Sequence, residues 1–341
     1  MKTRKIQLIN DSTFTVSLPR QWAIDHNIES GTPVRLYPDG DGSLILDPDS
    51  DRISKSVETQ LSIDDFSVQD TRRIVHALYA IGLDRFAFSS SGEIESKKRR
   101  SISGTATELI GLEVIREIDD SMVLRNLLDI HDTSVTQSVV QLQQLALSMY
   151  QDTLEALAEN KPDLAGNVIE RTDTIDRLFN LISRHFQRML TGLPEIDQLE
   201  LNRATMFDYY RTACQLERIS SQAKKIATAV QRSDTDSAAE ISDDVISSAH
   251  QSLTIVEDAI NILVSDDNVK KAYRVLTAHD HLSRRFEALD RELRNDNGVS
   301  GYLGGTVLDS IGILLECSSN IGGVVIQKES RDGINWAAPD S

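Results

Sequence analysis

The 341-residue chain is poor in cysteine, proline and aromatic residues, and each shortage narrows the class of protein. It has 2 cysteines, 7 prolines and 5% aromatic residues. Cys214 and Cys317 form no CxxC-type pair, which predicts reduced, buried thiols in a reducing compartment. No charged stretch followed by an apolar core opens the chain, and no apolar run approaches the ~18 to 20 residues of a membrane span. We therefore expect a cytoplasmic protein without membrane insertion.

Signatures of common enzymes are also missing. The sequence contains no GxxxxGK[ST] phosphate loop, no GxSxG elbow, no HExxH and no GxGxxG after a predicted strand. The histidines are scattered, and none forms the two-histidine and carboxylate set of a transition-metal centre. We therefore predict no catalytic residues and no enzymatic activity.

Positive charge is the remaining shortage, because the formal net charge is -17. A protein that coats itself with nucleic acid is basic, so any DNA contact must come from a local patch. Only 11 of the 36 basic residues are lysine, and aspartate occurs in clusters such as DPDSD and ISDD. This composition resembles that of halophilic archaeal proteins. An ordinary acidic soluble protein is the alternative.

The pattern of apolar residues divides the chain into segments of different secondary structure, which predicts a multidomain α+β protein. Residues 1–50 alternate apolar and polar positions between turn signals, with one short helix from Pro19 to His26. Residues 55–129 read as a small α/β module of order βαβαββ. Its helices are expected at 69–82 and 101–111, and a linker at 47–51 precedes it.

Beyond residue 131 the sequence has helical periodicity, with five breaks that leave six helices. DTIDRLF at Asp173–Phe179 is repeated as DHLSRRF at Asp280–Phe286, 107 residues later. The simplest interpretation is an elongated bundle of two three-helix repeats, 131–232 and 238–330. The pairs Gly304-Gly305 and Gly322-Gly323 would allow close helix packing.

One acidic helix face is a candidate metal site. Glu170, Asp173 and Asp176 are spaced to share a face, and Glu217 on the next helix could approach it. Oxygen ligands of this kind suit hard or di-iron-type cations. Acidic residues at helical spacing are also typical of a solvated face. In the second repeat Ser283 stands where Asp176 stands in the first, so the ligand count falls.

The N-terminal segment is locally basic within the acidic chain. Over the first 35 residues, five basic residues exceed three acidic ones, which leaves +2. Basic groups on a β scaffold suit contacts to DNA phosphates, although a small domain can reach this balance by chance. A third basic cluster, Lys97–Arg100, most simply balances Glu93 and Glu95. The five N-terminal residues are Lys2, Arg4, Lys5, Arg20 and Arg35.

The motifs STFTVSLPRQWA, HNIESGTPVRLY and SLILDP resemble the SpoVT/AbrB swapped-hairpin family. The resemblance covers about 45 residues and implies a β-barrel made by two interleaved chains that binds DNA. It also implies that Lys2, Arg4, Lys5 and Arg20 lie at or near the DNA-facing side. The same fold serves as the antitoxin of toxin–antitoxin pairs, whose chains are short.

Residues 134–330 resemble the PhoU family through NVIERTDTIDRLF and CQLERISSQAKKIA. The resemblance implies two three-helix repeats, and iron or zinc clusters bound by acidic groups. An acid expected four residues after Glu217 is Ser221, and the one expected four after Glu316 is Asn320. We therefore expect Glu170, Asp173, Asp176 and Glu217 to form a degenerate site at most, so iron or zinc is a candidate cofactor only.

Both resemblances in one chain are characteristic of archaeal phosphate-uptake regulators. They imply a homodimeric, DNA-binding regulator of phosphate homeostasis whose helical domain contacts a phosphate transporter or regulatory proteins. One alternative is an adaptor that restrains the transporter without binding DNA. Another is a metal-dependent phosphate-handling enzyme.

Overall fold

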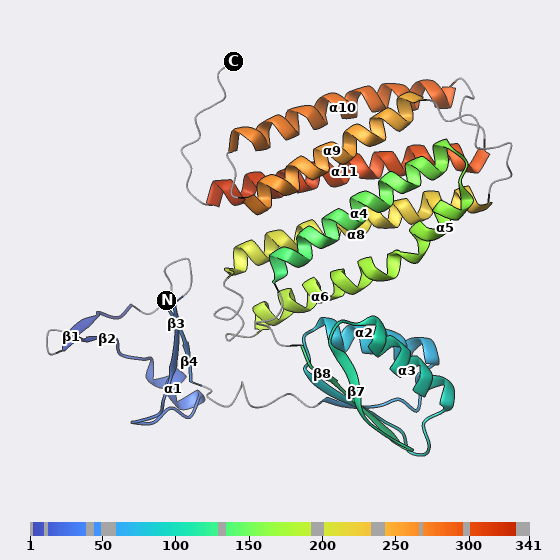
Figure 1. The fold of residues 1–341 in the computed structure, drawn as a ribbon. Coiled ribbons are helices and arrows are strands. Elements are labelled where there is room, and N and C mark those ends of the chain that lie inside the picture. Colours follow the sequence, from blue (N-terminus) through green and yellow to red (C-terminus); the bar gives the residue numbers. More distant parts are fainter. Residues whose placement is uncertain are drawn as a thin grey trace. The chain divides into compact units, whose positions relative to one another are not determined.

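The computed structural model describes residues 3–9, 13–38, 44–48, 59–128, 134–191, 201–232, 243–265, 269–295 and 301–331. The chain divides into two compact units, Met1–Ser56 and Val57–Ser341. Each unit is treated separately below, and Figure 1 gives the labels of their elements.

The N-terminal unit consists of two hairpin-like strand pairs and one short helix. β1 (Gln7–Ile9) pairs antiparallel with β2 (Thr13–Thr15), and β3 (Arg35–Pro38) pairs antiparallel with β4 (Leu44–Asp47). Between the pairs lies α1 (Arg20–Asp25). Pro19 is extended and occupies the N-cap position, so the helix begins one residue later than the predicted start at Pro19. Asn27 follows the helix with a left-handed φ of 53°, a conformation that asparagine tolerates.

The predicted β-barrel is not formed by the described residues of a single chain. Each sheet in this unit has two strands, and no sheet closes. A two-stranded pair buries little apolar surface, so its apolar side chains stay exposed. Only the closure of the sheet differs from the prediction; the order of strands and helix in the unit agrees with it.

The second unit begins with an α/β module whose order is βαβαββ, as predicted. Its elements are β5 (Thr59–Ser62), α2 (Val68–Ala80), β6 (Arg85–Ser89), α3 (Ser96–Glu108), β7 (Leu112–Ile118) and β8 (Ser121–Asn126). The sheet order is β5-β6-β8-β7, with β5 and β6 parallel and the other pairs antiparallel. Helices α2 and α3 cover one face of the sheet (Figure 1).

Apolar side chains at alternating strand positions fill the core of this module. Phe86 and Phe88 point toward the helices, and their rings meet edge to face at 5.8 Å. Tyr79 of α2 is buried beside them and donates its hydroxyl to the Ile110 carbonyl at 2.9 Å. Helix α3 begins at Ser96, five residues before the predicted start at Ser101. The sequence did not predict its first turns because they are polar and lack the apolar spacing that signals a helix.

The rest of the unit is a helical bundle with seven helices in its described residues, one more than predicted. They are α4 (Val135–Ala158), α5 (Pro162–Glu170), α6 (Thr172–Thr191), α8 (Arg203–Arg232), α9 (Asp243–Ser265), α10 (Val269–Asn295) and α11 (Gly301–Arg331). The extra helix arises because the predicted second helix breaks at Arg171. There the Thr172 hydroxyl donates to the Ile169 carbonyl at 2.8 Å, and the Thr174 amide to that of Arg171 at 3.1 Å.

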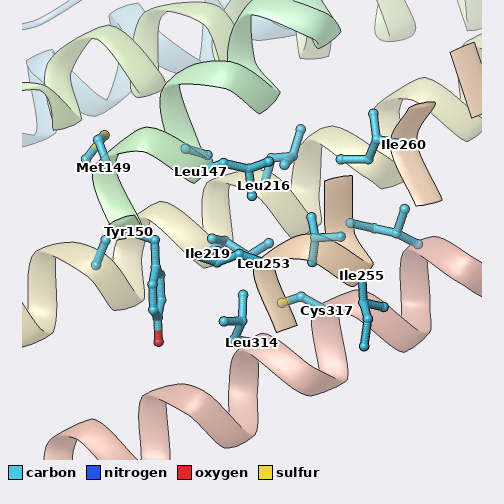
Figure 2. Close-up of a cluster of buried hydrophobic side chains, with 14 of the residues drawn as sticks. Leu147, Met149, Tyr150, Leu216, Ile219, Leu253, Ile255, Ile260, Leu314 and Cys317 are labelled. Carbon is cyan, nitrogen blue, oxygen red and sulfur yellow. The ribbon is translucent and has the colours of Figure 1, made fainter. Parts of the chain in front are cut away.

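A continuous apolar core joins the two halves of the bundle. Figure 2 shows Tyr150 of α4, Leu216 of α8, Leu253 of α9 and Leu314 of α11 within one cluster. Both thiols are free; Cys317 is buried in this core, as predicted, whereas Cys214 is only half-buried. Gly322 permits a close approach, since a Cβ there would lie 2.5 Å from Leu276 Cδ2. This agrees with the packing role predicted for the second glycine pair.

One segment of the described residues, Leu303–Arg331 of α11, is long and apolar enough to span a membrane by length and composition. In the bundle, 56% of its most apolar window is buried. Helix α11 packs against α8, α9 and α10, so its apolar side chains take part in the bundle core.

Candidate functional site

The predicted acidic set lies along helices α5, α6 and α8. Glu170 ends α5, and Asp173 and Asp176 occupy the first two turns of α6. All three side chains are exposed, whereas Glu217 in the middle of α8 is half-buried. Since α6 and α8 pack together, the four acids lie in one region of the bundle, but they differ in how far they are exposed to solvent.

Asp176 faces basic groups from two other elements. Partial desolvation raises the pKa of the Asp176 carboxyl, Lys224 of α8 opposes that effect, and Asp173 adds to it. His76 and Arg72 of α2 also lower it. Because burial also lowers the pKa of His76, the cations that act on Asp176 at neutral pH are Lys224 and Arg72, which partly neutralise the carboxylate.

Glu217 is held by its own helix. The Ser221 hydroxyl donates to Glu217 Oε1 at 3.1 Å, at the position where the PhoU-like motif would carry a second acid. Burial raises the pKa of the Cys214 thiol and of the Cys317 thiol, and Glu217 contributes to both shifts. Glu217 therefore takes part in a polar, partly buried cluster on α8.

The corresponding positions in the second half serve packing between helices. Glu316 pairs with Arg218 at 2.8 Å, and Asn320 donates to Gln215 at 3.1 Å, so α11 and α8 are joined by both. Ser283 and Ser318 bracket the His279 ring at 3.2 and 3.0 Å. Across the described ranges, no three His, Cys, Asp or Glu side chains could hold a metal ion together. The arrangement does not support the predicted iron or zinc site.

Sequence reasoning missed a charged contact between the α/β module and the bundle, which we call the Asp84 clamp (Asp84, Arg184 and Arg188). Arg184 of α6 donates to the Tyr79 and Leu83 carbonyls, each at 2.9 Å, and to Asp84 at 2.6 Å. Arg188 pairs with the same Asp84 oxygen. The Arg184 side chain is only 3% exposed, so the clamp satisfies carbonyl groups at the end of α2. The spacing of Arg184 and Arg188 on one face was its only sequence signal.

The clamp depends on Gly82, which has a φ of +92°. A Cβ at this position would lie 2.4 Å from Arg188 Cγ, so the site requires glycine for both conformation and space. His185, between the two arginines in sequence, is buried. Burial and these two cations lower its pKa to about 4, so its ring is neutral at physiological pH.

The predicted DNA-binding residues lie in the N-terminal unit. Arg4, Lys5 and Arg20 are exposed, whereas Lys2 lies outside the described residues. Arg4 and Lys5 precede β1, and Arg20 follows β2; because the two strands run antiparallel, the start of β1 and the end of β2 lie at the same end of the strand pair. The same end of the strand pair thus leads to Arg20. The structure gives neither Lys5 nor Arg20 a hydrogen bond or ion pair with a described residue.

The cluster Lys97–Arg100 has a structural role. Lys98 donates to the carbonyls of Ile63 and Asp64 at 2.8 and 3.2 Å. Arg99 pairs with Glu117 at 3.2 Å and lies 4.0 Å from Glu93, in partial agreement with the predicted balancing. Lys98 thus contacts the loop that follows β5, and Arg99 contacts β7 and the loop that follows β6.

Two family models match separate parts of the chain. The model described as PhoU domain matches residues 139–230, from α4 to the end of α8. The model described as antidote-toxin recognition MazE, bacterial antitoxin, matches residues 7–54. Each covers less than half of the chain. A comparison with curated proteins finds no match.

Solved structures of two PhoU proteins are similar to the chain. One is the phosphate transport system regulatory protein PhoU from Streptococcus pneumoniae, with 16% identity and a TM-score of 0.49 over 61% of this chain and 98% of that one. The other is PhoU from Pseudomonas aeruginosa, with 18% identity and a TM-score of 0.47 over 58% of this chain and 96% of that one.

Proposed function

We propose that the chain is a phosphate-responsive regulator that acts as a homodimer and binds DNA through its N-terminal unit. The observation that carries the proposal is the coexistence of the MazE match at 7–54 and the PhoU match at 139–230 in one chain. The helical bundle then reports phosphate status through contact with a phosphate transporter or regulatory protein. The archaeal, salt-adapted origin expected from composition remains a prediction.

The homodimer is supported by the exposed apolar surface of the N-terminal unit. Phe14 is 74% exposed and Ile6 is 70% exposed, and Leu8, Leu36 and Leu44 are exposed as well. A soluble unit rarely leaves so many large apolar side chains in water unless another surface covers them. A second N-terminal unit would bring two further strand pairs and the same apolar side chains.

DNA binding is supported by Lys5 and Arg20, whose charges are not used within the described chain. Phosphate contacts position a protein on DNA and need such unpaired basic groups. We expect that Arg4→Ala with Arg20→Ala abolishes specific promoter binding. The matched control is Lys225→Ala with Arg232→Ala, which removes the same charge from exposed positions of α8.

The test is chromatin immunoprecipitation of the tagged protein from cells grown with and without phosphate. Enrichment at phosphate-transport promoters that the Arg4/Arg20 variant loses and the control retains is the expected result. The adaptor alternative, favoured by the net charge of -17, predicts uniform background and co-purification of transporter subunits. That outcome would replace DNA binding with direct control of the transporter.

A further inference from the structure

Helix α10 carries a basic stripe along its exposed side. Lys270, Arg274, His281, Arg284 and Arg291 are all exposed, and steps of three and four residues keep them on one side. Thr277 and Ala288 complete the α10 stripe, which contains no acid. At 1.5 Å per residue it extends for about 31 Å. Its four permanent positive charges stand out in a chain of net charge -17.

The arginines of the stripe differ from a neighbouring arginine that has a structural partner. Arg285 pairs with Asp244 of α9 at 2.8 Å and so joins two helices. Among described residues, no hydrogen bond or ion pair engages Arg274, Arg284 or Arg291. Asp280 and Glu287 stand four residues before Arg284 and Arg291, about 40° around the helix, yet within the described ranges neither acid forms an ion pair with these arginines. The free guanidinium groups are therefore available to an external anion.

The opposite face of α10 limits the kind of partner. Val275, Leu282 and Phe286 are buried in the bundle, so this helix has no apolar face left to insert into a membrane surface. The stripe itself offers only Thr277 and Ala288 besides charge, and lacks the aromatic anchors of protein interfaces. Phosphate groups suit arginine because its guanidinium binds oxyanions through two parallel hydrogen bonds.

We propose that the α10 stripe is a second DNA-backbone contact surface, independent of base sequence. The inference rests on the proposed DNA-binding function and extends it to the helical bundle. Duplex DNA carries about one negative charge per 1.7 Å, so a straight row of arginines gains from the release of condensed counterions. A contact of this kind adds affinity and salt dependence, while the N-terminal unit supplies the choice of promoter.

The test measures binding of the full-length dimer to a labelled 30-base-pair duplex by fluorescence anisotropy over a range of salt concentrations. Arg274→Gln, Arg284→Gln and Arg291→Gln together should flatten the plot of log K against log salt by about 2.7, since each phosphate contact contributes about 0.9. The matched control is Arg203→Gln, Lys225→Gln and Arg232→Gln, exposed residues of α8 with the same total charge change. Unchanged thermal unfolding shows that both variants are folded.

The possible outcomes distinguish a failure of the stripe proposal from a failure of the proposed DNA-binding function. A stripe variant with the wild-type slope, while the Arg4/Arg20 variant no longer binds, overturns the stripe and leaves the proposed function standing. Equal flattening in the stripe variant and the α8 control reduces the effect to overall charge and also overturns it. Wild-type protein that binds no duplex overturns both. Loss of binding to vesicles with anionic lipid, with no change on DNA, would reassign the stripe to a membrane surface.

Discussion

The N-terminal unit and the α/β–helical unit differ in how they treat apolar side chains. In the described residues of the first unit no apolar side chain is buried, although Phe14, Ile6 and Val16 lie in or beside its strands. The second unit encloses one large core in the bundle and another in the α/β module. The second unit thus buries its apolar side chains within one chain, whereas the first leaves them exposed, as the proposed pairing of two N-terminal units would require.

The largest expected effect follows a substitution of Phe14, one of the exposed apolar side chains that distinguish the first unit from the second. Phe14→Asp places a charge on the exposed apolar surface and should convert the dimer to a monomer in size-exclusion chromatography with light scattering. Phe207→Asp is the matched control, because Phe207 is also exposed but lies on α8 of the self-contained unit. A dimer that survives Phe14→Asp, or is lost with Phe207→Asp, contradicts pairing through the N-terminal unit.

A smaller effect is expected at the Asp84 clamp, which joins the α/β module to the helical bundle within the second unit. Arg184→Met removes the donor to two backbone carbonyls and to Asp84, and a buried polar group without its partner costs about 1 to 3 kcal/mol. Chemical denaturation should detect this loss. Arg177→Met on the exposed side of α6 serves as the control. Equal stability of the two variants would show that the clamp contributes nothing to cohesion of the unit.

The smallest effect concerns the acidic face. Because the pKa of Asp176 is raised in the folded state, ionisation of its carboxyl lowers stability as the pH rises from the unfolded value of 3.8 through the folded value. Asp176→Asn should therefore raise stability at neutral pH, by no more than about 0.5 kcal/mol, and have no effect near pH 3. Thermal melts at both pH values test this. Destabilisation at neutral pH that appears only with added iron or zinc would instead indicate a metal ligand.

Local patterns predicted most of the elements. Strand alternation placed β7 at Leu112–Ile118, and the break at Lys161–Pro162 gave the start of α5 at Pro162. The start of α3 was missed because its first turns are polar and their contacts come from loops distant in sequence. The division at Arg171 was missed because helical periodicity continues across it, and the Thr172 hydroxyl bond found there has no periodic sequence signal.

The candidate site was less accessible to sequence reasoning. Helical spacing placed Asp173 and Asp176 near one another, but it could not reveal that cations from α2 and α8 face Asp176. The Asp84 clamp joins residues about a hundred positions apart, so the sequence signals only the spacing of its two arginines. The stripe on α10 is visible in the sequence only once the buried face of that helix is known. Pairings across elements set the charge environment of these residues.

The close approach at Gly82 restricts how this protein can change through evolution. A side chain at position 82 would need a smaller residue at position 188, which would in turn remove one arginine from Asp84. Because the φ of +92° would strain any side chain there, a smaller residue at position 188 would not by itself make a substitution at position 82 tolerable. Transplanting the α/β module onto another helical bundle would require the recipient helix to carry the same pair of arginines. The α/β module and the helical bundle should therefore be exchangeable only as a pair.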